Sequence, residues 1–292
     1  MEDFRFNVGF SGITVGFRLP GPITLPKRFA ALQCDDSLEP DETYTLQLLT
    51  EPLPLPGAMV SSVWETEIYR SEKGWLHIYP NLGDGNGCQV ACLFCPEGHH
   101  TIYYPASRWE EYSRVWNSAH LICGEQLLLK HDALLLHSSL VIHQGKAVLF
   151  FGPSGAGKST QAELWNKYLG APIINGDRTV IRKTEKGFTG GGSIWSGTSG
   201  IYHPDYAPIA GIFLVEKGEE NQVAALGPRA FKPLLTQTLV NSWNVDFMER
   251  ITDLLSELIN RVPIYRLTCR PDREAVELAR NTLFLSGKGE LL

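Results

Sequence analysis

The residues with the clearest capacity for chemistry run from Gly152 to Thr160 and read Gly-Pro-Ser-Gly-Ala-Gly-Lys-Ser-Thr. They fit the pattern G-x-x-x-x-G-K-[ST] of a phosphate-binding loop. Glycines let successive backbone N–H groups turn inward around phosphate oxygens, and a helix that follows adds positive partial charge at its N-terminus. We therefore expect a nucleoside triphosphate to be bound by Gly152, Ser154, Gly155, Ala156, Gly157, Lys158, Ser159 and Thr160.

The segments on either side of this loop are the elements that must position it. Residues 146–151 form an apolar run of strand length, and residues 161–169 read as a helix that Gly170 ends. In this arrangement Lys158 reaches the β- and γ-phosphates, and the Ser159 hydroxyl binds Mg²⁺. The loop contacts phosphates and not the base, so ATP, GTP and pyrophosphate all stay open as the donor.

The next predicted strand, the apolar residues 171–178, ends in a carboxylate, Asp177. The end of such a strand lies beside the phosphate-binding loop in a parallel or mixed sheet. Asp177 could therefore hold Mg²⁺, accept a proton from an attacking hydroxyl group, or do both. A plain turn residue is the alternative. The rival carboxylate is Glu216, which ends the equally apolar run 209–215.

Two further features surround this centre. His137 interrupts the apolar strand 134–143, which Gln144 and Gly145 turn back into the strand before the loop. A lone histidine on such a strand is more often a hydrogen-bonded core residue than a catalytic one. Residues 189–204 are rich in glycine but also contain Trp195, Tyr202 and His203. We therefore expect a lid or a substrate-binding loop rather than a linker.

The first part of the chain predicts a small β-rich domain over residues 1–105. Apolar, aromatic and β-branched residues recur in short runs, and proline-rich stretches at 19–26 and 51–57 suit surface loops. Residues 106–130 carry apolar residues at helical spacing, which predicts one connecting helix. The nucleotide-binding domain would then occupy residues 131–292, and the whole chain would be of the α/β class.

Three cysteines in the first domain allow another reading. Cys88, Cys92 and Cys95 have the spacing C-x3-C-x2-C of an iron–sulfur loop, and the adjacent His99 and His100 make zinc conceivable. The simpler interpretation is a strand in which cysteine serves as a small apolar residue. We favour the strand, because the surroundings lack the repeated βα units of a radical enzyme.

Composition narrows the function classes. The 292 residues carry a net charge of −6, which argues against a nucleic-acid surface or an anionic membrane as partner. No apolar run approaches the roughly 20 residues that span a bilayer, and the acidic start lacks the features of a signal peptide. Six cysteines in a chain of this length suggest reduced thiols. We expect a cytoplasmic protein.

The order of these features resembles the catalytic domain of HPr kinase/phosphorylase, whose fold is akin to that of phosphoenolpyruvate carboxykinase. A histidine on a strand, a hairpin, Gly-x-Ser-Gly-x-Gly-Lys-Ser, a strand ending in Asp177 and a glycine-rich loop carry the resemblance over about residues 130–270. The chain looks closer still to HPr-kinase-like proteins of bacteria, some of which accompany peptide-modifying enzymes. The resemblance also implies a homo-oligomer.

The resemblance implies roles for single residues. Lys158 and Ser159 match the lysine and serine of the family's loop, and His137 takes the place of the histidine that assists the catalytic aspartate. The family carries two adjacent aspartates where this chain has Gly176 and Asp177. One carboxylate is therefore missing, which weakens the expectation of reversible kinase and phosphorylase chemistry. The first 105 residues do not resemble the regulatory domain of HPr kinases, so protein HPr is not the expected substrate.

These observations predict a kinase that transfers a γ-phosphate to a hydroxyl group of a peptide, a protein or a small molecule. Asp177 would accept the proton, His137 would support it, Lys158 would hold the phosphates, and Arg178 would neutralise developing charge. Ser159 and Asp177 would hold the metal ion. The alternative is a nucleotide-gated peptide-binding or maturation protein with little phosphoryl transfer. A carboxykinase-like metabolic enzyme is a weaker third possibility.

Overall fold

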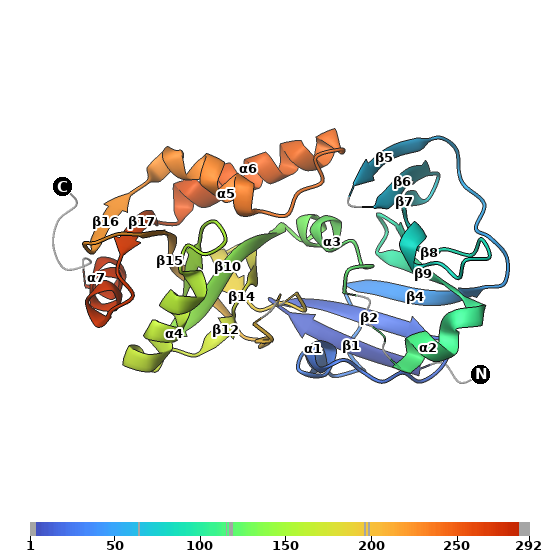
Figure 1. The fold of residues 1–292 in the computed structure, drawn as a ribbon, viewed down its shortest axis with the longest axis horizontal. Helices are drawn as coiled ribbons and strands as arrows, with labels where there is room; N and C mark the ends of the chain where they lie inside the picture. The colour runs from blue at the N-terminus through green and yellow to red at the C-terminus, as the bar shows by residue number, and fades with distance from the viewer. Residues whose placement is uncertain are drawn as a thin grey trace. The chain divides into compact units, whose positions relative to one another are not determined.

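The computed structural model describes residues 4–63, 65–114, 116, 119–195, 197 and 199–285. The chain forms two compact units, Met1–Leu127 and Leu128–Leu292 (Figure 1). Both contain a β-sheet, and the three longest described helices belong to the second unit, so the molecule is of the mixed α/β class. No described helix has the length and apolar character needed to cross a membrane.

Among the described residues, the sheet of the first unit has nine strands in the order β3-β1-β2-β4-β9-β8-β7-β6-β5. Its strands are β1 (Phe4–Phe10), β2 (Ile13–Leu19), β3 (Gln33–Cys34), β4 (Glu42–Leu49), β5 (Met59–Val63), β6 (Thr66–Ser71), β7 (Gly74–Tyr79), β8 (Val90–Phe94) and β9 (His99–Pro105). The pairs β2–β4 and β4–β9 are parallel, and the other neighbours are antiparallel. Short helices complete this unit: α1 (Lys27–Ala30), η1 (Pro80–Leu82), η2 (Ala106–Arg108) and α2 (Trp109–Arg114).

Alternating apolar residues explain why β1 and β2 form a hairpin with one covered face. Phe6 and Phe17 stack with ring centroids 5.0 Å apart, and Phe29 and Trp116 meet them edge-on or tilted. All four rings are fully buried. The sequence predicted strands here, and the short strands of residues 1–105 agree with it.

The expected single helix over residues 106–130 is wrong. The structure has η2 and α2 up to Arg114 and then α3 (Gly124–Lys130), while residues 119–123 are not helical. Cys123 lies in the left-handed region with φ of 48°, where α3 begins. Trp116, Ala119 and Ile122 are nevertheless buried. The apolar spacing therefore reflects burial of an irregular segment and not one face of a helix.

In the described part of the second unit, eight strands form the order β11-β10-β13-β14-β15-β17-β16, with β12 paired to β10 and β11 also paired to β15. They are β10 (Ala133–His143), β11 (Lys146–Phe151), β12 (Ile173–Asn175), β13 (Arg178–Thr184), β14 (Gly187–Gly191), β15 (Tyr206–Lys217), β16 (Gln222–Ala225) and β17 (Ile264–Cys269). The long strands β10 and β15 each pair with different partners along their length. The hairpin β13–β14 was not predicted, and the glycine-rich loop consequently begins at residue 192 instead of 189.

Helices cover this sheet on both faces. They are α4 (Lys158–Leu169), η3 (Gly227–Ala230), α5 (Phe231–Gln237), α6 (Val245–Arg261) and α7 (Arg273–Phe284). In β11, Leu149 and Phe151 pack in the core under α5 and α6, whereas Val148 and Phe150 pack under α4 and α7. Figure 1 shows the two helix pairs on opposite sides of the strands. Burial on both faces explains why β11 is apolar from residue 147 to residue 151.

Candidate phosphate-transfer site

The segment Gly152–Thr160 connects β11 to α4 as a tight loop, which we call the phosphate loop. Gly152 and Gly157 have φ values of 145° and 108°, a region that residues with a Cβ atom rarely adopt. Lys158 is the first residue of α4 and is 7% exposed. Its Nζ donates to the carbonyl oxygens of Gly152 and Pro153, at 3.0 and 3.1 Å. The loop thus curls around the ammonium group.

The start of α4 is also tied to the neighbouring strand. The Ser139 hydroxyl on β10 donates to the carbonyl oxygen of Lys158 at 2.7 Å, and both residues are buried. Burial lowers the pKa of the Lys158 ammonium, and the negative charge of Asp177 works against this shift. Ser139 was not predicted, because a serine on an apolar strand has no recognisable pattern.

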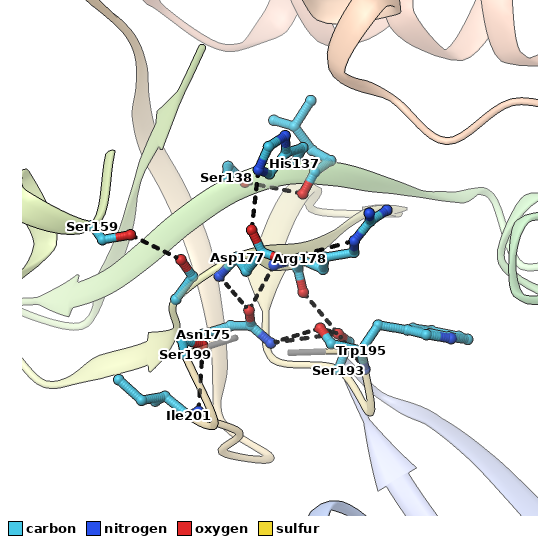
Figure 2. Close-up of polar contacts among 12 residues, drawn as sticks. His137, Ser138, Ser159, Asn175, Asp177, Arg178, Ser193, Trp195, Ser199 and Ile201 are labelled. Atoms are coloured by element: carbon cyan, nitrogen blue, oxygen red, sulfur yellow. Dashed lines mark hydrogen bonds and ion pairs between the residues drawn. The ribbon is translucent and has the colours of Figure 1, made fainter. Parts of the chain in front are cut away.

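Strand pairing brings His137 and Asp177 together across 40 residues of sequence. His137 on β10 lies opposite Arg178 on β13, and the Ser138 N–H donates to the carbonyl oxygen of Asp177 at 2.9 Å. His137 Nε2 is then 3.0 Å from Asp177 Oδ1 (Figure 2). Arg178 Nε lies 3.8 Å from Asp177 Oδ2. The two side chains of the histidine–aspartate pair are 30% and 25% exposed, so both remain accessible.

Burial lowers the pKa of His137, and the charges of Lys158 and Arg178 act in the same direction. Asp177 and a hydrogen bond with Gln237 oppose them. A neutral imidazole therefore faces the carboxylate near neutral pH. Its Nε2–H can donate to Asp177 and orient it without cancelling its negative charge.

Asn175 fixes the turn that presents Asp177. Its Oδ1 accepts the backbone N–H groups of Asp177 and Arg178 at 3.0 and 2.8 Å, which is the local bonding typical of asparagine in turns. Its Nδ2 donates to Ser193 Oγ and to the Trp195 carbonyl oxygen, at 3.4 and 3.3 Å. Asn175 is fully buried. The glycine-rich loop is thus attached to the aspartate turn through one amide, which Figure 2 shows.

A pocket of about 190 Å³ opens beside this aspartate. Its lining includes Ser159 on the phosphate loop, Asp177, Ser199 and Ile201 on the glycine-rich loop, and Glu163 on α4. The structure therefore brings Lys158, Ser159, Asp177, His137 and Arg178 into one neighbourhood. Sequence reasoning missed Glu163, which lies one helical turn after Ser159 and could have been found from that spacing.

The residues of this pocket suit Mg²⁺. Ser159 and Asp177 line the same space, and the Ser159 hydroxyl donates to the Gly176 carbonyl oxygen at 3.4 Å. Mg²⁺ prefers oxygen ligands, and it keeps several waters when only one or two come from protein. A hydroxyl and a carboxylate beside a phosphate loop match that preference.

The rival carboxylate has a different neighbourhood. Glu216 lies near the end of β15, opposite Thr268 of β17, and its carboxylate pairs with Arg266 at 3.3 Å. This is a cross-strand ion pair with both side chains almost half exposed. The geometry therefore favours Asp177 over Glu216 as the group that meets a phosphate.

The cysteines of the first unit take the simpler of the two predicted arrangements. Cys92 is fully buried in β8, where Val90 and Phe94 are buried too, and Cys88 and Cys95 flank that strand as free thiols. The Cys95 N–H donates to His100 Nδ1 at 3.0 Å. Within the described ranges, no three cysteine, histidine or acidic side chains gather as metal ligands do.

Comparison with known proteins finds likeness among solved structures alone. No protein-family model matches the chain, and no curated protein matches it. The chain is similar in structure to the Hpr(Ser) kinase/phosphatase from Coxiella burnetii, with a TM-score of 0.31 and 12% sequence identity. The similarity covers 52% of this chain and 88% of that one. Because this likeness is distant, a proposal for the function must come from the geometry of the site.

Proposed function

We propose that this protein binds a nucleoside triphosphate, with ATP as the leading candidate, and transfers its γ-phosphate to a hydroxyl group. One observation carries the proposal. Ser159 of the phosphate loop lines the same pocket as Asp177, and His137 Nε2 lies 3.0 Å from that carboxylate. A phosphate cradle next to an oriented base is what phosphoryl transfer to an alcohol needs.

The reaction follows from the placement of the groups. Backbone N–H groups of the loop and the Lys158 ammonium bind the β- and γ-phosphates. Asp177 accepts the proton of the acceptor hydroxyl. The hydroxyl oxygen forms a bond to the γ-phosphorus, and the bond from that phosphorus to the β-phosphate oxygen breaks. His137 keeps the carboxylate oriented, and Arg178 offsets charge on the transferred group. Mg²⁺, held by Ser159 and Asp177, would supply neutralisation of phosphate charge.

The acceptor is proposed as a serine of a peptide or protein, or a small-molecule alcohol. The pocket of about 190 Å³ is lined by polar groups such as Ser199 and by the apolar Ile173 and Ile201, and it has room for a hydroxymethyl group.

A second candidate function is nucleotide-gated binding or maturation of a peptide with little transfer. It is favoured by Gly176, where the resembling family has a second carboxylate. A Cβ atom at Gly176 would lie only 2.5 Å from Ser199 Cβ, so the loop leaves no room there for another acid. A site with one carboxylate could bind a nucleotide and transfer slowly.

Phosphate accounting separates the two candidates. The protein is incubated with γ-labelled ATP and Mg²⁺, alone and with serine peptides and a set of small alcohols, and Lys158→Ala serves as the blank. We expect label on an acceptor. ATP binding without transfer or hydrolysis above the blank would favour the second candidate.

Asp177→Asn tests the assignment of the base. The change keeps the size of the side chain and removes its proton-accepting charge, so transfer should fall by about 1,000-fold while ATP binding persists. Asp205→Asn is the control, because Asp205 is an exposed aspartate directly before β15 and outside the pocket lining. Retained transfer in Asp177→Asn would show that another group takes the proton.

A further inference from the structure

A second pocket lies on the opposite flank of the phosphate loop. It measures about 280 Å³ and lies where the first turn of α4 meets the ends of β15 and β17. Its lining includes Thr160, Gln161, Val215, Gly218, Cys269 and Pro271. The strands β15 and β17 run parallel to β11, and ligands bind at such carboxyl ends in open α/β sheets.

Gln161 is the unusual residue of this pocket. It is 2% exposed, and its Nε2 donates to Cys269 Sγ at 3.2 Å. Its Oε1 is buried and has no hydrogen-bond partner among the residues that the structure describes. Buried polar atoms are normally paired, because leaving one unpaired costs free energy. An unpaired acceptor in a pocket wall beside a phosphate loop points to a ligand that donates an N–H or O–H.

The order of residues on α4 decides which part of a nucleotide would come here. Ser159 lines the pocket of Asp177, whereas the next residue, Thr160, lines the second pocket. A triphosphate held by the loop has two ends. If its γ-phosphate faces Asp177, its nucleoside must leave on the side of β15 and β17.

We propose that this second pocket binds the nucleoside of the substrate, and that Gln161 Oε1 accepts an N–H of its base. The inference rests on the proposed function and deepens it, since it assigns base recognition to a loop that by itself contacts only phosphates. Val215 and Pro271 supply apolar surface for the flat base, while the hydrogen bond to the buried amide of Gln161 orients the base. Pyrophosphate, which has no base, is then a poorer donor than a nucleoside triphosphate.

Binding of two ligands tests the assignment without any need for the acceptor. ATP and inorganic tripolyphosphate, each with Mg²⁺, are titrated calorimetrically into the unaltered protein, Gln161→Leu and Gln126→Leu. Gln126 is the control, because it too is a buried glutamine, but it belongs to the first unit.

We expect Gln161→Leu to weaken ATP binding about tenfold, the value of one hydrogen bond to a buried group, and to leave tripolyphosphate within about twofold. Gln126→Leu should change neither. Equal weakening of both ligands, or unchanged ATP binding, would overturn the base pocket. Lys158→Ala should lose both ligands, and its failure to do so would instead overturn the proposed function.

Photolabelling of the unaltered protein avoids any question of misfolding. An 8-azidoadenosine triphosphate probe is irradiated with the protein and Mg²⁺, and labelled peptides are identified by mass spectrometry. Label on residues 215–218 or 269–271 that excess unlabelled ATP removes supports the pocket. Label confined to the flank of Asp177 overturns it.

Discussion

Each unit of the molecule contains a histidine–carboxylate pair, and the two pairs are built for different ends. In the first unit His100 Nε2 lies 2.8 Å from Glu42 Oε2, and both side chains are 0% exposed. In the second unit His137 and Asp177 make a similar contact at 3.0 Å but keep 30% and 25% of their side-chain surface exposed. The same chemical partners are thus sealed in one unit and open to a pocket in the other.

The surroundings explain the difference. His100 accepts the Cys95 N–H at Nδ1, and its ring lies against Phe94 and Tyr44 with centroids 4.3 and 4.4 Å away. Both ring nitrogens are engaged, and the aromatic walls exclude water. His137 instead lies near the cations Lys158 and Arg178, and its partner Asp177 lines a pocket. A histidine–carboxylate contact alone therefore does not mark a catalytic site, and access to a ligand space is the deciding property.

Glu42→Ala should have the largest effect of the changes that separate the two pairs. It leaves the His100 N–H buried without its carboxylate, and removal of one partner of a buried pair costs about 3–5 kcal/mol. We expect the free energy of unfolding of the first unit, measured by urea denaturation, to fall by that amount. ATP binding should persist under conditions in which the variant remains folded.

Asp177→Ala is the control for that measurement. Its pair is partly exposed, and such pairs contribute about 0–1 kcal/mol, so the second unit should unfold at nearly the same urea concentration. If Asp177→Ala destabilises as much as Glu42→Ala, the pair in the second unit is a structural element, and the contrast between the units disappears.

Gly197→Ala sharpens the functional side of the comparison. Gly197 has a φ of 53°, and a Cβ atom there would overlap the carboxylate of Asp177. The aspartate must move away, and a displacement of about 1 Å can reduce a reaction by about 100-fold. We expect that loss in the rate of transfer, with little change in ATP affinity.

Gly200→Ala provides the comparison for Gly197→Ala. Gly200 also has a positive φ, of 63°, but a Cβ atom there would meet nothing within 4 Å. Both changes strain the backbone of the same loop, and only one reaches the aspartate. Equal losses in the two variants would attribute the effect to the loop backbone and not to the position of Asp177.

The sequence predicted the parts of the site that are local in the chain. The phosphate loop and its two flanks form one continuous segment, so the pattern from Gly152 to Thr160 was sufficient to place a turn between a strand and a helix. The cap of helix α7 is equally local, because Asp272 accepts the backbone N–H of Ala275, three residues later. Local hydrogen bonds leave a local signature.

Features that depend on strand register could not be read in the same way. The contact of His137 with Asp177 needs the pairing of β10 with β13, and the sequence alone suggested a core histidine until the family resemblance was considered. The roles of Asn175 and Gln161 depend on partners 18 and 108 residues away. Such contacts have no fixed spacing, so only the folded chain reveals them.

The smallest of these predictions concerns the pH dependence of transfer. Burial lowers the pKa of His137, so the imidazole is neutral at pH 7 and becomes charged only below about pH 6.5. Protonated His137 would pair with Asp177 and reduce its ability to accept a proton. We expect kcat/KM for transfer to fall by up to about tenfold per pH unit on the acid side.

Titration of His137 should also lower the free energy of unfolding as the pH falls, in parallel with the rate of transfer. Because the folded state has the lower His137 pKa, the unfolded state binds more protons as the pH falls, and acid therefore favours unfolding. Circular dichroism at each pH identifies the range in which the protein remains folded, and rates are compared only there. His137→Gln should lower the rate at pH 8 and flatten the acid limb, since glutamine keeps a donor for Asp177 but does not titrate. An unchanged acid limb in His137→Gln would assign the titration to another group and reduce His137 to the structural role that His100 has in the first unit.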